Sequence, residues 1–114
     1  MDMKPYGLGD WTVLTPPHRR LDASIAEPLT QAFAAAARSG SVRFVIDLSA
    51  VDFMDSAGLG SLVFFRKRLG AQGQVVIAGA QQEVATILKI THLDRVFRLI
   101  PTPAAVRQLS VANT

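Results

Sequence analysis

The hydrophobic residues of the chain follow two alternating spacings, one typical of buried strands and one typical of amphipathic helices. Short apolar runs are rich in branched and aromatic residues, as strands covered on both faces are. These runs lie at 11–14, 42–48, 75–78 and 96–100. Between and after them, apolar residues recur at helical spacing. The predicted helices lie at 24–39, 84–91 and 101–109, with a further helix that starts at 56 and ends at Gly70 or Gly73.

The alternation of strands and helices decides the predicted fold class, because helices of this length can cross over between parallel strands. We expect an α/β fold with a small, mostly parallel β-sheet of about four or five strands, covered by about four helices. The run at 96–100 should form an edge strand. We find no repeat or linker, so residues 1–114 should form one domain. Its core should span about 10–109, with residues 1–9 and 110–114 peripheral.

Polar residues and a glycine mark the ends of the first predicted helix. Ser24 and Glu27 have the spacing of a capping box, in which each side chain bonds the other residue's backbone N–H. Pro28 falls within the first turn, where a missing N–H costs least. Gly40 is placed to end the helix as its C′ residue.

Composition narrows the class of protein. Of the 114 residues, 49% are hydrophobic and 18% charged, so the chain can bury a core and is not disordered. It has no cysteine, which excludes disulfides and thiolate metal sites. The N-terminus lacks the apolar core of a signal peptide, and no apolar run is long enough to span a membrane. We therefore expect a cytoplasmic protein without a transmembrane segment.

The positive charge is a weak indication of nucleic-acid binding. The net charge is +3, and the basic residues are scattered along the chain. One cluster, at 66–68, lies within a predicted amphipathic helix, where a solvated face is the simpler interpretation. We expect no direct binding to nucleic acid.

The segment DSAGLG, residues 55–60, carries the main candidate chemistry. A nucleophilic Ser56 would need a positioned base, and the only histidines are His18 and His92, both in predicted loops. A nucleophile elbow needs glycine two residues before and after the serine, and this chain has Met54 and Gly58 there. Phosphate-binding loops and metal-ligand motifs are missing too. We therefore expect no catalytic residue, no cofactor and no metal, and a protein that is not an enzyme.

Two interpretations of this segment stay open. Asp55 or Ser56 could simply cap the helix that follows. Capping does not require Gly58 and Gly60, which cost up to about 1 kcal/mol each in a helix and bare the surface beside Ser56. An exposed hydroxyl there suits a partner's active site. Its phosphorylation would add about −1.5 to −2 charge next to the free N–H groups of a helix start, which the fold should tolerate.

Three stretches of the chain resemble the STAS domain of single-domain anti-sigma-factor antagonists. LDAS at 21–24 is similar to the family's Leu-Asp segment. FVIDLSAVDFMDSAGLGSLV at 44–63 resembles its strand–loop–helix hallmark, and THLDRVFRLIPTPAAV at 91–106 its C-terminal end. The resemblance covers about 21–109 and implies a sheet covered by helices. It also implies that Ser56 is a phosphorylated serine at the start of the second helix.

The resemblance implies partner switching in bacterial signal transduction and transcription regulation. The unphosphorylated protein would bind an anti-sigma factor that is also a serine kinase of the GHKL ATPase type, and so free a sigma factor. Phosphorylation of Ser56 would release the complex, and a PP2C-type phosphatase would reverse the step. The same resemblance assigns partner binding to the motif and to acids beside the serine. These residues are Asp22, Asp55, Ala57, Gly58, Leu59 and Gly60.

Alternatives from other classes also stay open. A STAS domain can be the accessory subunit of a membrane transporter, in particular a lipid ABC transporter. A serine esterase would turn over an activated ester and lose that activity in Ser56→Ala. A nucleic-acid-binding protein would show salt-dependent retention on DNA.

Two departures from the family pattern bear on the site. Ala57 stands where a second hydroxyl residue is common, which leaves Ser56 as the single candidate in the motif. His18, Arg19 and Arg20 replace the usual Gly-Glu pair. We hypothesise that Arg19 or Arg20 stabilises phosphorylated Ser56 or reaches an acidic partner. The simpler interpretation is solvated loop charge.

Helix geometry singles out Phe64. On a helical wheel it lies nearly opposite the core position Leu62, on the side of Ala57 and Gly60. It is therefore either covered by another element or an exposed anchor beside Ser56. We predict the anchor, because aromatic side chains often dominate interfaces.

Overall fold

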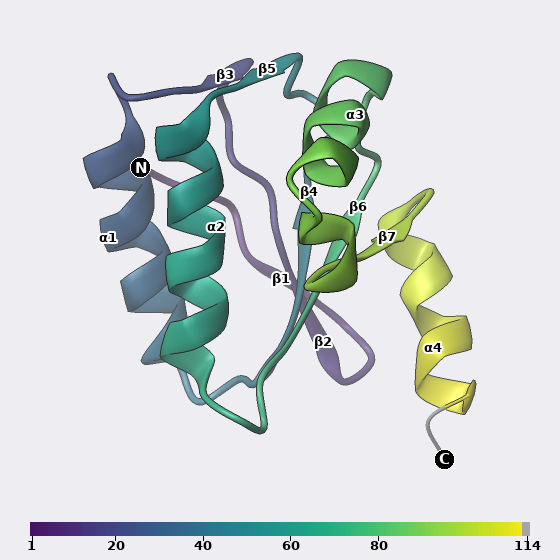
Figure 1. The fold of residues 1–114 in the computed structure, drawn as a ribbon. Helices are drawn as coiled ribbons and strands as arrows, with labels where there is room; N and C mark the ends of the chain where they lie inside the picture. The colour runs from purple at the N-terminus through teal and green to yellow at the C-terminus, as the bar shows by residue number, and fades with distance from the viewer. Residues whose placement is uncertain (113–114) are drawn as a thin grey trace.

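A five-stranded sheet with the order β1-β2-β4-β6-β7 forms the centre of the molecule (Figure 1). The structure, a computed structural model, describes residues 1–112. The strands are β1 (Tyr6–Leu8), β2 (Trp11–Leu14), β4 (Arg43–Asp47), β6 (Gln74–Ala78) and β7 (Arg98–Ile100). β1 runs antiparallel to β2, and the other neighbouring strands are parallel. The predicted mostly parallel α/β sheet is therefore confirmed, and the run at 96–100 supplies an edge strand.

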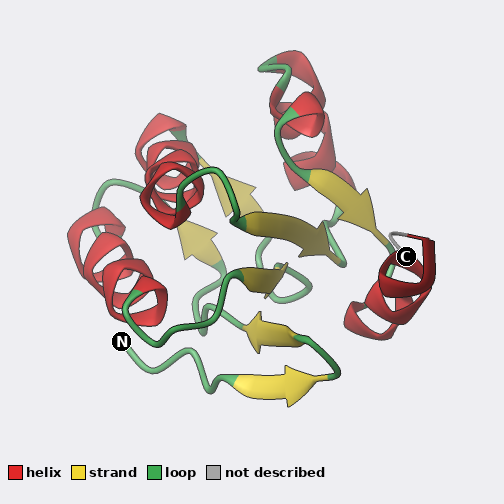
Figure 2. Ribbon diagram, turned by 90° about the horizontal axis from the view of Figure 1, so that it is seen from below, coloured by secondary structure: helices red, strands yellow, loops and turns green. Residues whose placement is uncertain are grey.

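Helices cover both faces of this sheet (Figure 2). They are α1 (Ala26–Ala37), α2 (Ser56–Leu69), α3 (Gln82–Ile90) and α4 (Val106–Ala112), with single 3₁₀ turns η1 (Leu93–Arg95) and η2 (Pro103–Ala105). α1 and α2 lie side by side and share one core with α3, whereas α4 packs on the opposite face. Because both faces are covered, the central strands are nearly continuous in apolar residues.

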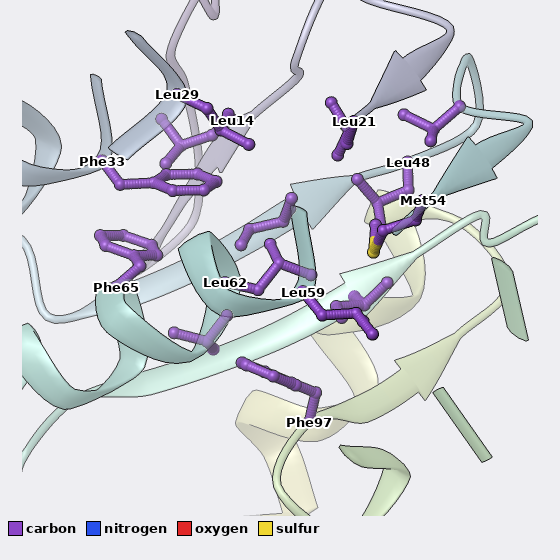
Figure 3. Packing of buried hydrophobic residues seen from close by; sticks show 14 of the residues in the cluster. Leu14, Leu21, Leu29, Phe33, Leu48, Met54, Leu59, Leu62, Phe65 and Phe97 are labelled. Carbon is purple, nitrogen blue, oxygen red and sulfur yellow. The ribbon is translucent and has the colours of Figure 1, made fainter. Parts of the chain in front are cut away.

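Successive residues of the central strands point into different cores. In β4, Phe44 and Ile46 join the larger core with α1, α2 and α3, while Val45 joins the smaller core with α4. Phe33 of α1 stacks on Phe65 of α2, with ring centroids 4.7 Å apart and planes at 13° (Figure 3). Phe44 meets Phe65 edge-on at 5.0 Å. Aromatic packing therefore fixes the two helices to each other and to the sheet.

A second, two-stranded sheet positions the segment that holds Ser56. Its strands are β3 (Arg20–Leu21) and β5 (Phe53–Met54), which are parallel. The side chains of Leu21 and Met54 are buried in the larger core (Figure 3). α2 starts directly after β5, at the end of the molecule where β3 and β5 lie (Figure 1). The hydrophobic pattern did not predict these strands, because two residues are too few to show a period.

The expectation that residues 1–9 are peripheral is only partly right, because most of them are exposed but they add an edge strand and one buried side chain. Residues 6–8 form the edge strand β1, and Met3 is only 5% exposed in the larger core. The backbone N–H of Thr15 donates to the carbonyl of Met3 at 3.0 Å. The expectation that residues 110–114 are peripheral can be compared with the structure only up to residue 112. α4 continues to Ala112, and 113–114 lie outside the described residues.

The predicted start of the first helix is also wrong. α1 begins at Ala26 behind the N-cap residue Ile25, and no side chain caps it. The hydroxyl of Ser24 donates instead to the carboxylate of Asp22 at 2.6 Å, so the capping box does not form. Gly40, with φ 96°, lies two residues past the C-cap rather than one.

Candidate functional site

The carboxylate of Asp55 caps α2 and ties its start to the loop that follows β3. Asp55 is extended, with φ −108° and ψ −172°, as an N-cap residue is. Its Oδ1 accepts hydrogen bonds from the backbone N–H groups of Ala57 at 2.9 Å and Gly58 at 3.0 Å. Its Oδ2 accepts one from the N–H of Ala23 at 3.1 Å. Of the two predicted caps, Asp55 therefore performs the role, which leaves Ser56 without it.

Ser56 is the first residue of α2, and its side chain is exposed. Within residues 1–112 its hydroxyl makes no hydrogen bond, so neither capping nor packing accounts for it. The same observation means that no described histidine is bonded to it as a base. An exposed hydroxyl with no internal partner can enter the active site of another protein.

The two glycines of the segment 55–60 have different roles. A Cβ on Gly58 would lie 2.1 Å from the carbonyl oxygen of Leu21, so only glycine lets α2 pack this closely on β3. A Cβ on Gly60 would meet nothing within 4 Å. The prediction that both glycines bare the surface beside Ser56 is wrong for the buried Gly58 and confirmed for the exposed Gly60.

The predicted contact residues of the motif divide between core and surface. Leu59 is 9% exposed and packs in the larger core (Figure 3), and Gly58 is buried. Contact of these two residues with a partner stays a prediction. Ala57 is half-buried. Solvent reaches a face of α2 whose members follow one another at helical spacing, and we call it the exposed α2 face. It consists of Ser56, Gly60, Phe64 and Lys67.

Phe64 is exposed on this face, as the helical wheel predicts. Its relative exposure is 37%, whereas the next residue, Phe65, is 0% exposed in the core. Other parts of the domain therefore cover Phe64 only in part, and its remaining surface is open to a partner. Phe64 follows Ser56 by eight residues, about 12 Å along the helix axis. Its role as an anchor stays a prediction.

Asp22 lies in a hydrogen-bonded loop between β3 and α1. Its Oδ1 accepts from the Ser24 hydroxyl at 2.6 Å and from the Ser24 backbone N–H at 3.0 Å, and its Oδ2 pairs with Arg20 Nε at 3.3 Å. The hydroxyl bond from Ser24 is the main cause that holds the pKa of Asp22 below its usual value. The backbone bond and Arg20 act in the same direction, and burial opposes them. Asp22 thus carries a fixed negative charge at this end of the molecule.

Arg19 and Arg20 lie near Ser56 but are bound to other groups. Arg19 Nε donates to Asp52 Oδ2 at 2.9 Å, and the Arg20 guanidinium lies 4.0 Å from the ring centroid of Phe53. Both arginines line a shallow pocket of about 380 Å³ in the loop between β2 and α1. Within residues 1–112, neither arginine contacts Ser56 by a hydrogen bond. Because exposed ion pairs are weak, both arginines can exchange partners when another anion arrives.

Ser61 is a polar residue of the site region that the sequence analysis did not assign. It is 3% exposed, and its hydroxyl lies 3.0 Å from that of Thr30 in α1. It also donates to the carbonyls of Ala57 at 3.2 Å and Ala26 at 3.4 Å. Ser61 therefore ties α2 to the first turn of α1. Its place among apolar residues in the sequence is the signal that could have indicated such a role.

Metal and membrane features are not found in the part of the chain that the structure describes. Over residues 1–112, no three histidine or acidic side chains are grouped closely enough to hold a metal ion. None of the helices in this range has both the length and the apolar composition needed to cross a membrane.

Comparisons with known proteins agree with this architecture. The chain superposes on the crystal structure of an anti-sigma factor antagonist from Mycobacterium paratuberculosis with a TM-score of 0.82 and 27% identity, covering 92% of this chain and 89% of that one. It superposes on an anti-sigma-factor antagonist (STAS) domain protein from Planctomyces limnophilus with a TM-score of 0.81 and 26% identity, covering 90% and 92%.

A relative in sequence and a family model define the family. A STAS-domain containing protein of Pseudomonas aeruginosa is 33% identical over 58 residues, which is 50% of this chain and 57% of that protein. The match thus spans little more than half the length of that relative. The model of the STAS domain family matches residues 9–106, which include every strand of the central sheet except β1. The chain belongs to the STAS domain family.

Proposed function

We propose that this STAS domain is an anti-sigma-factor antagonist that acts as a phosphorylation-controlled binding switch. The unphosphorylated chain binds an anti-sigma factor of the GHKL ATPase type, which is also its serine kinase. Phosphorylation of Ser56 releases this partner, and a PP2C-type phosphatase restores binding. The chain itself supplies the acceptor and no catalytic residue.

The exposed Ser56 hydroxyl carries this proposal, because nothing inside the domain uses it. Asp55 already caps the helix, so selection for a cap does not explain a serine in the next position. Solved structures with 26% and 27% identity that are described as anti-sigma factor antagonists support the same role.

A phosphate on Ser56 would enter a site that already carries negative charge. Asp55 takes the N–H groups of Ala57 and Gly58, so these two groups are not free for a phosphate, contrary to the sequence-based expectation. The helix dipole favours the phosphate, and the carboxylate of Asp55 opposes it. Solvent screens both effects at an exposed side chain, so the fold should tolerate the modification.

Phosphorylation should therefore weaken partner binding rather than destabilise the fold. A partner that lies against the bare surface of Gly60 and contacts Phe64 would enclose Ser56 and remove water from it. A dianion enclosed in this way loses its hydration unless new donors replace the water. A penalty of about 3 kcal/mol would weaken binding roughly a hundredfold.

The direct test is a pull-down from the native bacterial lysate with the wild-type chain and matched variants. Ser56→Ala removes the acceptor, and Ser56→Asp adds a charge. Gln108→Glu adds the same charge to an exposed position of α4, on the other face of the sheet. We expect Ser56→Ala and Gln108→Glu to capture the same ATPase-type kinase as the wild type. Ser56→Asp should capture at least about tenfold less, which corresponds to about 1.4 kcal/mol of lost binding.

Mass spectrometry of the captured proteins and of the wild-type chain completes the test. Phosphate at Ser56 and the kinase among the partners would support the proposal. Equal capture by Ser56→Ala and Ser56→Asp, with both variants folded by circular dichroism, would contradict it. Capture of a membrane transporter instead of a kinase would favour the accessory-subunit alternative.

A further inference from the structure

A cavity of about 370 Å³ lies at the end of the sheet opposite Ser56. Its lining includes Trp11, Gln74 and Arg98, which are the first residues of β2, β6 and β7. These strands are parallel, so their starts share one edge of the sheet. Arg66, near the end of α2, reaches the same cavity, about 15 Å along the helix from Ser56. The cavity is therefore separate from the proposed switch.

Three arginines and one aspartate line this cavity. Arg66, Arg95 and Arg98 line it together with Asp94, which gives it a formal charge of about +2 at neutral pH. Within residues 1–112, no carboxylate lies within ion-pair distance of these three arginines, whereas Arg43 outside the cavity pairs with Asp10 at 3.7 Å. Arg66 donates through one nitrogen to the carbonyl of Gly70 at 3.0 Å, and its other N–H groups remain available.

A shielded amide oxygen adds a second polar feature. Gln74 lines the cavity, and its Oε1 is shielded from solvent without accepting a hydrogen bond within the described residues. Buried side-chain oxygens without a hydrogen-bond donor are uncommon. The cavity thus offers a hydrogen-bond acceptor together with arginines that have no carboxylate partner in the described part of the chain. The buried side chains of Trp11, Val75 and Leu109 complete the walls.

We propose that this cavity binds a small, soluble phosphate monoester that also carries hydroxyl groups. The guanidinium N–H groups of Arg66, Arg95 and Arg98 match the oxygens of a dianionic phosphate. A ligand with a single carboxylate would not neutralise the charge of about +2 in the cavity. A hydroxyl of the same molecule donates to Gln74 Oε1 once the amide turns toward the cavity. The volume lies within the range of small-molecule sites.

The test uses glycerol 3-phosphate as the probe in isothermal titration calorimetry. Propyl phosphate has the phosphate without the hydroxyl groups, and glycerol has the hydroxyl groups without the phosphate. We expect glycerol 3-phosphate to bind more tightly than propyl phosphate, and glycerol not to bind. Raising the salt concentration should weaken the binding, because charge carries it.

Variants connect the binding to this cavity. Arg98→Gln should lower the affinity for glycerol 3-phosphate by about tenfold or more, because hydrogen bonds to charged groups are stronger than those between neutral groups. Arg68→Gln removes the same charge from an exposed position of α2 that does not line the cavity, and it should leave the affinity unchanged. Arg98→Gln is a more specific test of binding than Arg66→Gln, because Arg66 also donates a hydrogen bond to the backbone of Gly70 and its loss could affect the fold.

Several outcomes would overturn the proposal. One is no heat of binding for the wild-type chain with any phosphate probe. Another is an equal loss of affinity in Arg68→Gln and Arg98→Gln, which would indicate attraction by overall charge alone. A third is co-sedimentation with phosphatidylcholine vesicles that contain phosphatidic acid, without binding of soluble glycerol 3-phosphate, which would assign the arginines to a lipid headgroup. Unchanged unfolding curves for both variants ensure that any loss reflects binding.

Discussion

At the residue scale, Gly58 and Gly60 stand two positions apart in the same helical turn, yet their surroundings differ. A Cβ on Gly58 would meet the Leu21 carbonyl oxygen at 2.1 Å, and a Cβ on Gly60 would meet nothing. Gly58→Ala should lower the free energy of unfolding by about 1–3 kcal/mol, because backbone must move to admit the methyl group. Gly60→Ala should raise it by up to about 1 kcal/mol, because alanine loses less conformational entropy in a helix.

Urea unfolding followed by circular dichroism measures both effects. Gly60→Ala serves as the control for Gly58→Ala, because both variants add one methyl group to the same turn. Equal changes in the two variants would contradict the close packing of α2 on Leu21. If the surface beside Ser56 must be bare for docking, Gly60→Ala should also weaken partner capture while it stabilises the fold.

The charge of Asp22 gives a prediction about pH. Its pKa is lowered in the folded state, chiefly by the Ser24 hydroxyl, so the stabilisation is fully present above the unfolded pKa near 4. It is lost as the pH falls through the lower folded pKa. The stability difference between the wild type and Asp22→Asn should therefore stay constant from about pH 7 to about pH 5 and shrink as the pH falls below about 4. In a Ser24→Ala background, urea unfolding should show a smaller dependence on pH.

At the scale of elements, long strands and helices followed from the hydrophobic pattern, and short ones did not. β2 begins and ends where the pattern predicts, and α2 ends at the first of the two expected glycines, Gly70. β1, β3 and β5 have at most three residues, so tertiary pairing decides them. α1 lacked its predicted cap because Asp22 bonds Ser24 instead. A local alternative partner of this kind is not visible in a spacing rule.

The candidate site was predictable in its residues and less so in its contacts. The sequence places Ser56 and Asp55 at a helix start, because acid, serine and an apolar helical period occur together. It could not show that Gly58 touches Leu21, since 37 positions separate the two residues along the chain. The arginine cavity was equally hidden, because Arg66 and Arg98 come from different elements.

Two adjacent phenylalanines of α2 allow folding and binding to be separated. Phe65 is fully buried against Phe33 and Phe44, so Phe65→Ala should lower the free energy of unfolding by about 3–5 kcal/mol. Phe64 is 37% exposed, so Phe64→Ala should change stability by less than about 1 kcal/mol. If Phe64 anchors the partner, Phe64→Ala should reduce capture by at least about tenfold.

Calorimetric unfolding and quantitative pull-down measure the two quantities side by side. Lys67→Ala, on the same exposed α2 face but one turn further from Ser56, is a matched control for the loss of a long side chain. Full capture by Phe64→Ala would remove Phe64 from the proposed contact surface and leave the Ser56 switch untouched.

At the scale of the whole molecule, the parallel topology places the proposed switch and the arginine cavity at opposite ends. β4 begins at Arg43 and ends at Asp47. α2 begins after Asp55 and ends with basic residues at 66–68, which complement the helix dipole. The proposed switch therefore lies at one end, where Asp22 and Asp52 are paired with Arg20 and Arg19, and the arginine cavity lies at the other. A partner docked at Ser56 leaves the cavity open to a small anion.

The edge strand β1 gives the last prediction. β1 covers one edge of β2, and Met3 just before it is buried in the larger core. A chain that lacks residues 1–8 should lose about 1.5–3 kcal/mol from Met3 burial alone, and more from β1. It should also expose the N–H and C=O groups of β2, which can pair with a second chain. Met3→Ala loses the buried side chain but keeps β1, so it should be destabilised and keep the oligomeric state of the wild type. Urea unfolding measures the stability, and light scattering measures the oligomeric state. A shortened chain that matches the wild type in both would support the expectation that 1–9 is peripheral.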